Sequence, residues 1–178
     1  MKDLTERTLA SKRVFEGRAL TIDVLDIEMP DGRKTTREVV RHRGAVAILG
    51  EVPDGRFVFV RQYRKAVEDT LLEVVAGCLE PGEEPESAAR REMEEESGYV
   101  VQELRKLGTI VCTPGYCEEH LHLYYARLSE RPHELSPDFD ENLEPLLMTA
   151  EEIDAAIASG ALYDAKSICA WHYWTRRS

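Results

Sequence analysis

Residues 77–99 read GCLEPGEEPESAARREMEEESGY. Within this segment, residues 80–96 contain eight glutamates and two arginines, so the local formal charge is 2 − 8 = −6. Strong helix formers follow Pro85, which suits a first helical turn, and Gly98 suits the left-handed position just past a helix end. The sequence therefore predicts an acidic helix over about residues 85–97.

Three carboxylates would share one face of this helix. Glu92, Glu95 and Glu96 stand at positions i, i+3 and i+4, which places their Cβ atoms about 5–6 Å apart. A run of glutamates is commonly no more than a solvated helix face. Carboxylate oxygens grouped in this way are also the hard ligands that Mg²⁺ and Mn²⁺ prefer. The spacing of the whole segment decides between these two interpretations.

The segment resembles the signature of the Nudix hydrolase family, G-x₅-E-x₇-R-E-U-x-E-E-x-G-U, where U is a bulky apolar residue. A chance match to its seven invariant positions has a probability on the order of 10⁻⁵ at this composition. Tyr99 is an aromatic residue at a position that is more often aliphatic. The fixed positions fall on Gly77, Glu83, Arg91, Glu92, Met93, Glu95, Glu96, Gly98 and Tyr99.

The resemblance implies a role for each matching residue. Two or three Mg²⁺ or Mn²⁺ ions would be held by four groups: the carboxylates of Glu92, Glu95 and Glu96, and the main-chain carbonyl of Ala76. Glu95 and Glu96 are at the same time candidates for a catalytic role. Glu83 and Arg91 would fix the loop onto the helix, and a phosphate-binding role for Arg91 is the weaker alternative in so acidic a segment. Gly77 and Gly98 would be backbone positions where a side chain obstructs the turn.

The chemistry itself calls for cations. Hydrolysis of a phosphoanhydride brings water to phosphorus while negative charge moves onto the leaving phosphate, so the protein must supply positive charge and position. Divalent ions polarise phosphoryl oxygens and lower the pKa of bound water.

Flanking residues narrow the substrate. Thr113-Pro114-Gly115-x₃-Glu119 resembles the Ser-Pro-Gly-x-x-x-Glu element of ADP-ribose pyrophosphatases, in which the residues matching Gly115 and Glu119 shape the ribose site. An ordinary Pro-Gly turn is the alternative interpretation. Upstream, the resemblance implies substrate contacts for Arg37, Arg64 and Glu73. Each arginine taken alone could equally be a solvated strand residue.

We therefore expect Mg²⁺-dependent hydrolysis of the diphosphate of ADP-ribose to AMP and ribose 5-phosphate. One alternative is another nucleoside diphosphate sugar, such as GDP-mannose. A nucleotide-binding regulator without catalysis is a third possibility, but modules of that kind typically lack the metal-binding glutamates.

A general base is expected in the acidic part of the loop over residues 129–145, where Glu141 and Glu144 are the two candidates. An idle, solvated acidic loop is the alternative.

Composition limits the partners. The chain has 178 residues and a formal charge of −11, which disfavours nucleic acid and anionic membranes as partners. The four cysteines include no C-x-x-C pair, and neither they nor the histidines show zinc-ligand spacing. The N-terminus has no apolar signal region, and no apolar stretch approaches the roughly 20 residues that span a bilayer. We expect a soluble, cytoplasmic protein.

The pattern of elements predicts an α/β fold. Strands are expected at 20–29, 35–40, 45–49, 57–60, 107–111 and 120–128, and further helices from Thr149 to Gly160 and over 166–176. The resemblance implies an α/β/α sandwich with a mixed sheet over residues 43–178. Residues 1–42 would form a β-rich segment with a hairpin, and the resemblance implies that this segment forms a homodimer.

Overall fold

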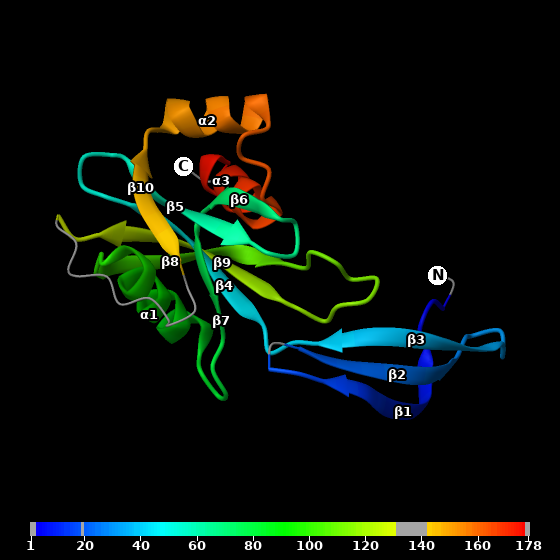
Figure 1. Ribbon diagram of the computed structural model, residues 1–178. Helices are drawn as coiled ribbons and strands as arrows, with labels where there is room; N and C mark the ends of the chain where they lie inside the picture. Colours follow the sequence, from blue (N-terminus) through cyan, green and yellow to red (C-terminus); the bar gives the residue numbers. More distant parts are fainter. Residues whose placement is uncertain (1–2, 19, 131–141, 177–178) are drawn as a thin grey trace. The chain divides into compact units, whose positions relative to one another are not determined.

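The computed structural model describes residues 3–18, 20–130 and 142–176 (Figure 1). The chain divides into two compact units, one made of residues 1–43 with 111–119, and the other of residues 44–110 with 120–178. The first unit thus combines the N-terminal segment with residues 111–119, which are distant from it in the sequence.

The first unit contains a three-stranded antiparallel sheet in the order β1 (Arg7–Glu16), β2 (Thr21–Glu28), β3 (Lys34–Arg41). The predicted hairpin corresponds to β2 and β3, whose turn has Gly32 at φ 84°. Strand β1 was not predicted, because its ten residues are all exposed and carry no alternating apolar pattern. The segment 111–119 pairs with β3: the Val40 N–H donates to the Tyr116 carbonyl at 2.7 Å.

The second unit contains a seven-stranded mixed sheet. Its main path is β10-β5-β4-β9-β8, with β6 paired to β5 and β7 paired to β4. The β4–β9 pair is parallel and the other pairs are antiparallel. The strands are β4 (Ala45–Glu51), β5 (Phe57–Arg64), β6 (Asp69–Glu73), β7 (Val75–Cys78), β8 (Val101–Ile110), β9 (Leu121–Leu128) and β10 (Leu143–Met148).

Helices cover both faces of this sheet (Figure 1). Alternate residues of β4 pack in opposite directions, since successive side chains of a strand point to opposite faces. Val46 and Ile48 join a cluster with Met93 of α1 (Pro85–Ser97), while Ala47 joins a cluster with Ile153 of α2 and Trp171 of α3. Helix α2 spans Ala150–Ser159 and α3 spans Ala165–Thr175. The expected α/β/α sandwich is confirmed.

Local signals placed the helices well and some strands poorly. Helix α1 has the predicted bounds, and α2 begins with the predicted capping box of Thr149 and Glu152. Strand β8 begins six residues before the predicted residue 107, and β10 takes residues 143–145 from the predicted loop. Strands β6 and β7 were not predicted, because both are short. No helix among the described residues is long and apolar enough to cross a bilayer.

Candidate active site

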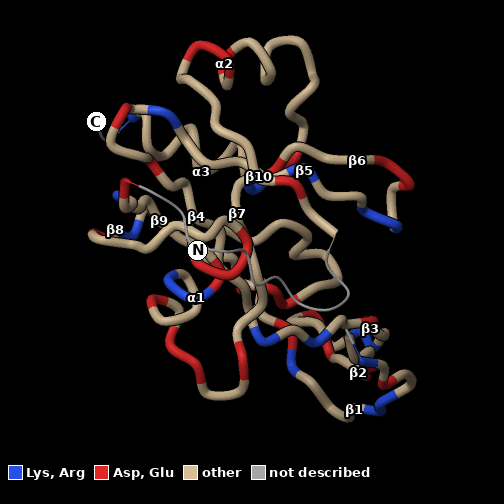
Figure 2. The backbone as a smooth tube through the Cα atoms, turned by 60° about the vertical axis from the view of Figure 1, so that its left-hand side comes forward, with Lys and Arg blue, Asp and Glu red and all other residues tan. Residues whose placement is uncertain are grey.

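Two of the three carboxylates on the acidic face of α1 are buried, and the third, Glu95, has a side chain that is 39% exposed. Glu92 is 8% exposed and Glu96 is 2% exposed, and Met93 between them is fully buried. Acidic residues recur along α1 and the loop before it (Figure 2). Burial of an ionised carboxylate is costly unless a positive group is close. This face therefore needs a cation.

The backbone of β7 approaches this face closely at Gly77. A Cβ atom built on Gly77 would lie 2.0 Å from the carboxylate carbon of Glu92, a distance that no side chain can accept. The carboxylate of Glu92 thus occupies the space that a side chain at position 77 would fill. Ala76, whose carbonyl is the expected fourth metal ligand, directly precedes Gly77 and pairs with Ala47 of β4.

One guanidinium group connects the helix to the preceding loop. Arg91 Nε and Nη2 donate to the two carboxylate oxygens of Glu83 at 3.0 and 2.9 Å. Its Nη1 donates to Glu92 Oε1 at 2.8 Å and to Glu95 Oε2 at 3.0 Å. The bond to Glu83 contributes most to raising the pKa of Arg91, and Arg91 in turn lowers the pKa of Glu83. We call these four residues the acidic network; its formal charge is 1 − 3 = −2.

The donor groups suit a divalent ion. Among the described residues, no three acidic, histidine or cysteine side chains converge on one point that could hold a metal. Mg²⁺ commonly uses only one or two carboxylates and completes its shell with water and substrate phosphates. Buried carboxylates beside a strand carbonyl, in a network with a surplus of two negative charges, fit that requirement. Glu92, Glu95, Glu96 and the Ala76 carbonyl are the groups that would hold the ion.

A second network lies around Glu73, at the end of β6. Its carboxylate is 1% exposed. Arg64 Nε and Nη2 donate to its two oxygens at 2.8 and 2.7 Å, and Lys166 of α3 forms a further ion pair with it. Burial alone would raise the pKa of Glu73, but the hydrogen bond from Arg64 and the charge of Lys166 outweigh it and lower the pKa. Glu96 is close enough to contribute to the raised pKa of Arg64, after the larger effect of Glu73.

Sequence reasoning placed Arg64 and Glu73 at the site and missed Lys166. Lys166 lies 93 residues from Glu73 in the chain, and no local pattern links the two. The segment Asp164-Ala165-Lys166-Ser167 reads only as the start of a helix.

The remaining expected substrate residues belong to the first unit. Arg37 on β3 is bound by Glu6 through Nε at 3.1 Å and Nη2 at 2.5 Å. Gly115 lies in the turn where the Tyr116 N–H donates to the Thr113 carbonyl at 3.2 Å. Glu119 lies with its Oε1 3.6 Å from His42 Nδ1. Thus Glu119 and His42 are neighbours within this unit, and Arg37 already has an acidic partner there.

One of the two candidates for the general base lies on a strand of the second unit. Glu144 lies on β10, opposite Arg61 of β5, and the two side chains are 3.6 Å apart and well exposed. Glu141 lies outside the described residues. Glu144 is therefore placed on a strand rather than in the predicted loop.

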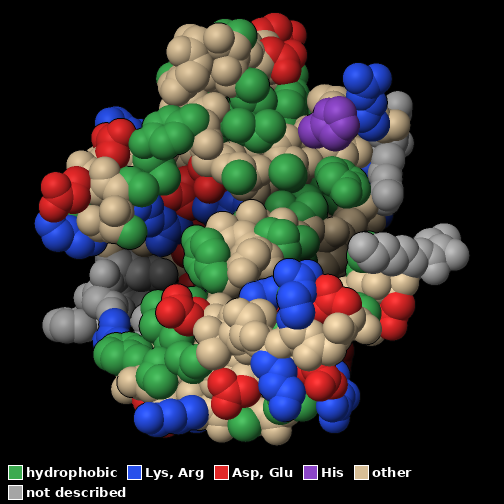
Figure 3. Space-filling model, turned by 90° about the vertical axis from the view of Figure 1, so that its right-hand side faces the viewer, with side chains coloured by type: hydrophobic (Ala, Val, Ile, Leu, Met, Phe, Trp, Pro, Cys, Tyr) green, Lys and Arg blue, Asp and Glu red, His purple; other side chains and the backbone are tan. Residues whose placement is uncertain are grey.

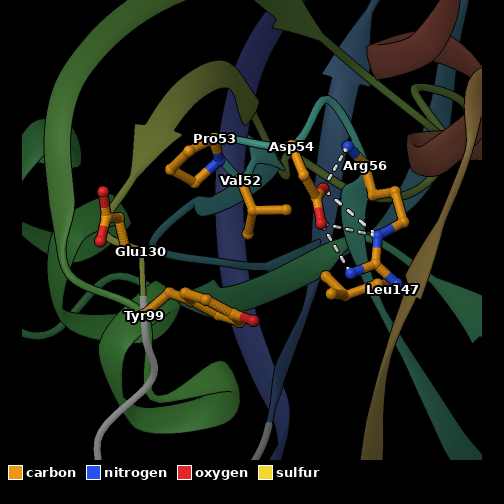
Figure 4. Close-up of a pocket in the computed structure, with 7 residues that line it drawn as sticks. All are labelled: Val52, Pro53, Asp54, Arg56, Tyr99, Glu130 and Leu147. Carbon is orange, nitrogen blue, oxygen red and sulfur yellow. Dashed lines mark hydrogen bonds and ion pairs between the residues drawn. The ribbon is translucent and has the colours of Figure 1, made fainter.

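A small open cavity lies elsewhere in the second unit (Figure 4). Its volume is about 190 Å³, and it is lined by Val52, Pro53, Asp54, Arg56, Tyr99, Glu130 and Leu147. Arg56 and Asp54 are joined there by a short ion pair at 2.7 Å. None of the metal-binding candidates lines this cavity, so we do not assign it to the chemistry.

A family model described as the NUDIX domain matches residues 41–170 of this chain. The chain belongs to the Nudix family. The resemblance inferred from the segment 77–99 is thus confirmed, and with it the expectation of a hydrolase. Nudix hydrolases generally use divalent metals, in line with the acidic face of α1.

Similar proteins cover nearly the whole Nudix chain. An ADP-ribose pyrophosphatase of Bacillus subtilis (strain 168) is 40% identical over 97% of this chain and 94% of its own length. A methanol dehydrogenase activator of Bacillus methanolicus is 37% identical over 94% and 91%. A GDP-mannose pyrophosphatase of Yersinia enterocolitica is 29% identical over 93% and 90%. A crystal structure of an ADP compounds hydrolase matches the fold with a TM-score of 0.84 at 23% identity, covering 99% of this chain and 96% of that one.

Proposed function

We propose that this Nudix hydrolase cleaves the diphosphate linkage of ADP-ribose, with Mg²⁺, to give AMP and ribose 5-phosphate. The observation that carries this proposal is the acidic network beside buried Glu96 and the close backbone of Gly77. Such a face can hold the cations that diphosphate hydrolysis requires. The 40% identity to an ADP-ribose pyrophosphatase supports the choice of substrate.

In the proposed site, two or three Mg²⁺ or Mn²⁺ ions would be held by the carboxylates of Glu92, Glu95 and Glu96 and by the Ala76 carbonyl. When bound, the metal supplies polarisation of phosphoryl oxygens and acidification of water. The bonds from Arg91 to Glu83 keep the loop before α1 in place. Gly77 leaves room for the carboxylate of Glu92.

Separate residues are assigned to the phosphate, to the ribose and to the nucleotide. We assign the exposed part of the Arg64 guanidinium to a phosphate oxygen, with Glu73 behind it as the orienting carboxylate. Gly115 and Glu119 are assigned to the ribose. Arg37 is assigned to the nucleotide, and to reach it the Arg37 side chain has to leave Glu6.

A glutamate would accept the proton of the attacking water. The new bond forms between the water oxygen and phosphorus, and the bond from phosphorus to the bridging oxygen breaks, with the negative charge leaving on a phosphate. Glu141 and Glu144 are the candidates. Glu144 has its carboxylate in solvent beside Arg61, so it would have to change partner to serve.

The test is a panel of nucleoside diphosphate sugars incubated with Mg²⁺, with the products separated by chromatography. We expect ADP-ribose to give AMP and ribose 5-phosphate with the highest kcat/KM. GDP-mannose is the main competitor, which its pyrophosphatase relative favours. A higher kcat/KM for GDP-mannose would replace the proposed substrate, and no hydrolysis of any member would overturn the proposal.

We also propose a cytoplasmic homodimer formed through residues 1–42. Strand β1 is exposed along its whole length and presents Leu9, Val14 and Phe15, each at least 39% exposed. Apolar side chains lie exposed among charged ones on the face shown in Figure 3. An exposed strand edge with apolar side chains favours pairing with another chain. Sedimentation of the full chain as a monomer at micromolar concentration would refute the dimer.

A further inference from the structure

The first turn of α3 is attached to Val74, the residue between β6 and β7, just before the metal-binding segment. The N–H of Val74 donates to Ser167 Oγ at 2.8 Å, and both residues are fully buried. The Ser167 N–H donates to Asp164 Oδ2 at 3.0 Å, which caps the helix. A side chain of α3 thus fixes the backbone two residues before the Ala76 carbonyl.

The preceding residues of both segments, Lys166 and Glu73, form an ion pair. The lysine ammonium group lies between the carboxylates of Glu73 and Asp164, and the N–O distance to Asp164 is 3.1 Å. The Lys166 side chain is only 15% exposed, whereas a lysine normally keeps its charge in solvent. The ammonium group of Lys166 is therefore mostly buried, and it is paired with two carboxylates inside the unit.

Glu73 now has two cations, and they differ in exposure. The Arg64 side chain is 40% exposed and that of Lys166 is 15% exposed. Arg64 uses one edge of its guanidinium, Nε and Nη2, for Glu73, and Nη1 has no hydrogen-bonding partner among the described residues. Lys166 secures the carboxylate from the inside, while Arg64 faces outward. We call Arg64, Glu73, Asp164 and Lys166 the neutral network, because its formal charge is 2 − 2 = 0.

We infer that Lys166 is a positioning residue for substrate binding: it holds Glu73 in place, and Glu73 orients Arg64 so that Nη1 points to the substrate diphosphate. This inference rests on the proposed function, which assigns Arg64 to phosphate. Without Lys166, the buried carboxylate keeps one cation only and draws the Arg64 guanidinium further into its own neutralisation. The phosphate then loses an oriented donor.

Loss of Lys166 is expected to change KM rather than kcat. Arg64 would contact phosphate in the bound substrate as well as in the transition state, so loss of its orientation weakens both states alike. We expect Lys166→Met to raise KM for ADP-ribose about tenfold, the scale of one hydrogen bond to a charged group, with kcat nearly unchanged. Lys166→Arg retains the charge and is expected to bring KM back to near the wild-type value.

The experiment is a double-mutant cycle of Lys166→Met and Arg64→Ala. It measures KM and kcat on the best substrate of the panel, and the Kd for the same compound by calorimetry in EDTA. If Lys166 acts through Arg64, the double variant has the KM and Kd of Arg64→Ala alone. Lys65→Met is the matched control, since Lys65 is exposed, adjacent to Arg64 and, among the residues that the structure describes, paired only to the exposed Glu68. Thermal melts establish that each variant is folded.

The outcomes separate this inference from the proposed function. Additive effects of the two substitutions, or a Lys166→Met variant with a lower melting temperature and unchanged KM and Kd, would overturn the positioning role. If Lys166→Met does not fold, Lys166→Arg and Lys166→Gln in the same cycle decide the question. A wild-type chain that neither binds nor hydrolyses any panel compound would overturn the proposed function as well.

Discussion

The acidic network and the neutral network solve opposite electrostatic problems in one unit of this protein. In the acidic network, Arg91 serves three carboxylates, and the sum is −2. In the neutral network, buried Glu73 has two cations, and the sum with Asp164 is zero. The negative charge of the acidic network is not balanced without an added cation, whereas the charges of the neutral network balance one another. We therefore expect the acidic network to bind metal and the neutral network to keep the Arg64 side chain in a fixed orientation.

The two networks also differ in how the chain builds them. All members of the acidic network lie within residues 83–95, and helical spacing alone brings most of them together. The neutral network joins β5, β6 and the start of α3, and its members Glu73 and Lys166 lie 93 residues apart in the chain. Substitutions in the first should affect metal binding, and substitutions in the second should affect substrate binding and stability.

The largest effect is expected for Glu96→Gln. The substitution removes one negative charge from the buried metal-binding face but preserves the shape of the side chain. Loss of several kcal/mol of charge stabilisation corresponds to a fall in kcat of about 10³-fold. The melting temperature without metal should hold or rise, because like charges on one face repel.

Glu94→Gln is the control for this experiment, since Glu94 lies on the same helix but is exposed. Steady-state kinetics in saturating Mg²⁺ and thermal melts in EDTA measure both quantities. A Glu96→Gln variant with near-wild-type kcat would contradict the metal-binding role.

The next largest effect concerns the general base. The charge of −2 on the acidic network would repel a further carboxylate in the empty site, so the base has to approach when substrate is bound. Glu141→Gln and Glu144→Gln are expected to behave differently, one with kcat lower by about 10²-fold or more and the other close to wild type. KM should change little in both, since proton transfer acts in the transition state. Two mild variants would move the base to Glu95 or to metal-bound hydroxide.

Arg91→Met should sharpen the contrast between the networks. It leaves three carboxylates together without their cation, so we expect a lower melting temperature in EDTA. Because the surplus charge becomes −3, added Mg²⁺ should raise the melting temperature of this variant more than that of the wild type. Arg90→Met is the neighbouring control, since Arg90 donates to the Val101 carbonyl outside the network. An equal Mg²⁺ shift in wild type and Arg91→Met would argue against metal binding at this network.

The smallest effect on catalysis is expected for Ser167→Ala. The buried N–H of Val74 loses its acceptor, which should lower the free energy of unfolding by about 1–3 kcal/mol. Ser159→Ala is the control, because Ser159 is exposed and its hydroxyl donates to the Ala156 carbonyl of its own helix. Urea denaturation measures the difference. A KM shift as large as that of Lys166→Met would show that the helix attachment, rather than the lysine charge, orients Arg64.

The sequence predicted what local spacing determines. The bounds of α1, its acidic face and the capping box at Thr149 all follow from contacts between residues three or four apart. Strand β1 was missed because its exposed residues lack the alternation that marks a half-buried strand. Lys166 was missed because its partner is chosen by the packing of α3 on the sheet. No periodic pattern in the sequence indicates that Lys166 and Glu73 are in contact.

The contact between Glu73 and Lys166 has a consequence for synthesis. A ribosome adds about 5–20 residues per second, so roughly 5 to 20 s pass between these two residues. Once residue 99 has been added, the nascent chain contains the whole signature segment, but the carboxylate of Glu73 still has only one of its two cations. We expect diphosphate binding to reach its full affinity only after α3 has left the exit tunnel, so a chain stalled before residue 166 would carry the metal-binding helix without an oriented Arg64.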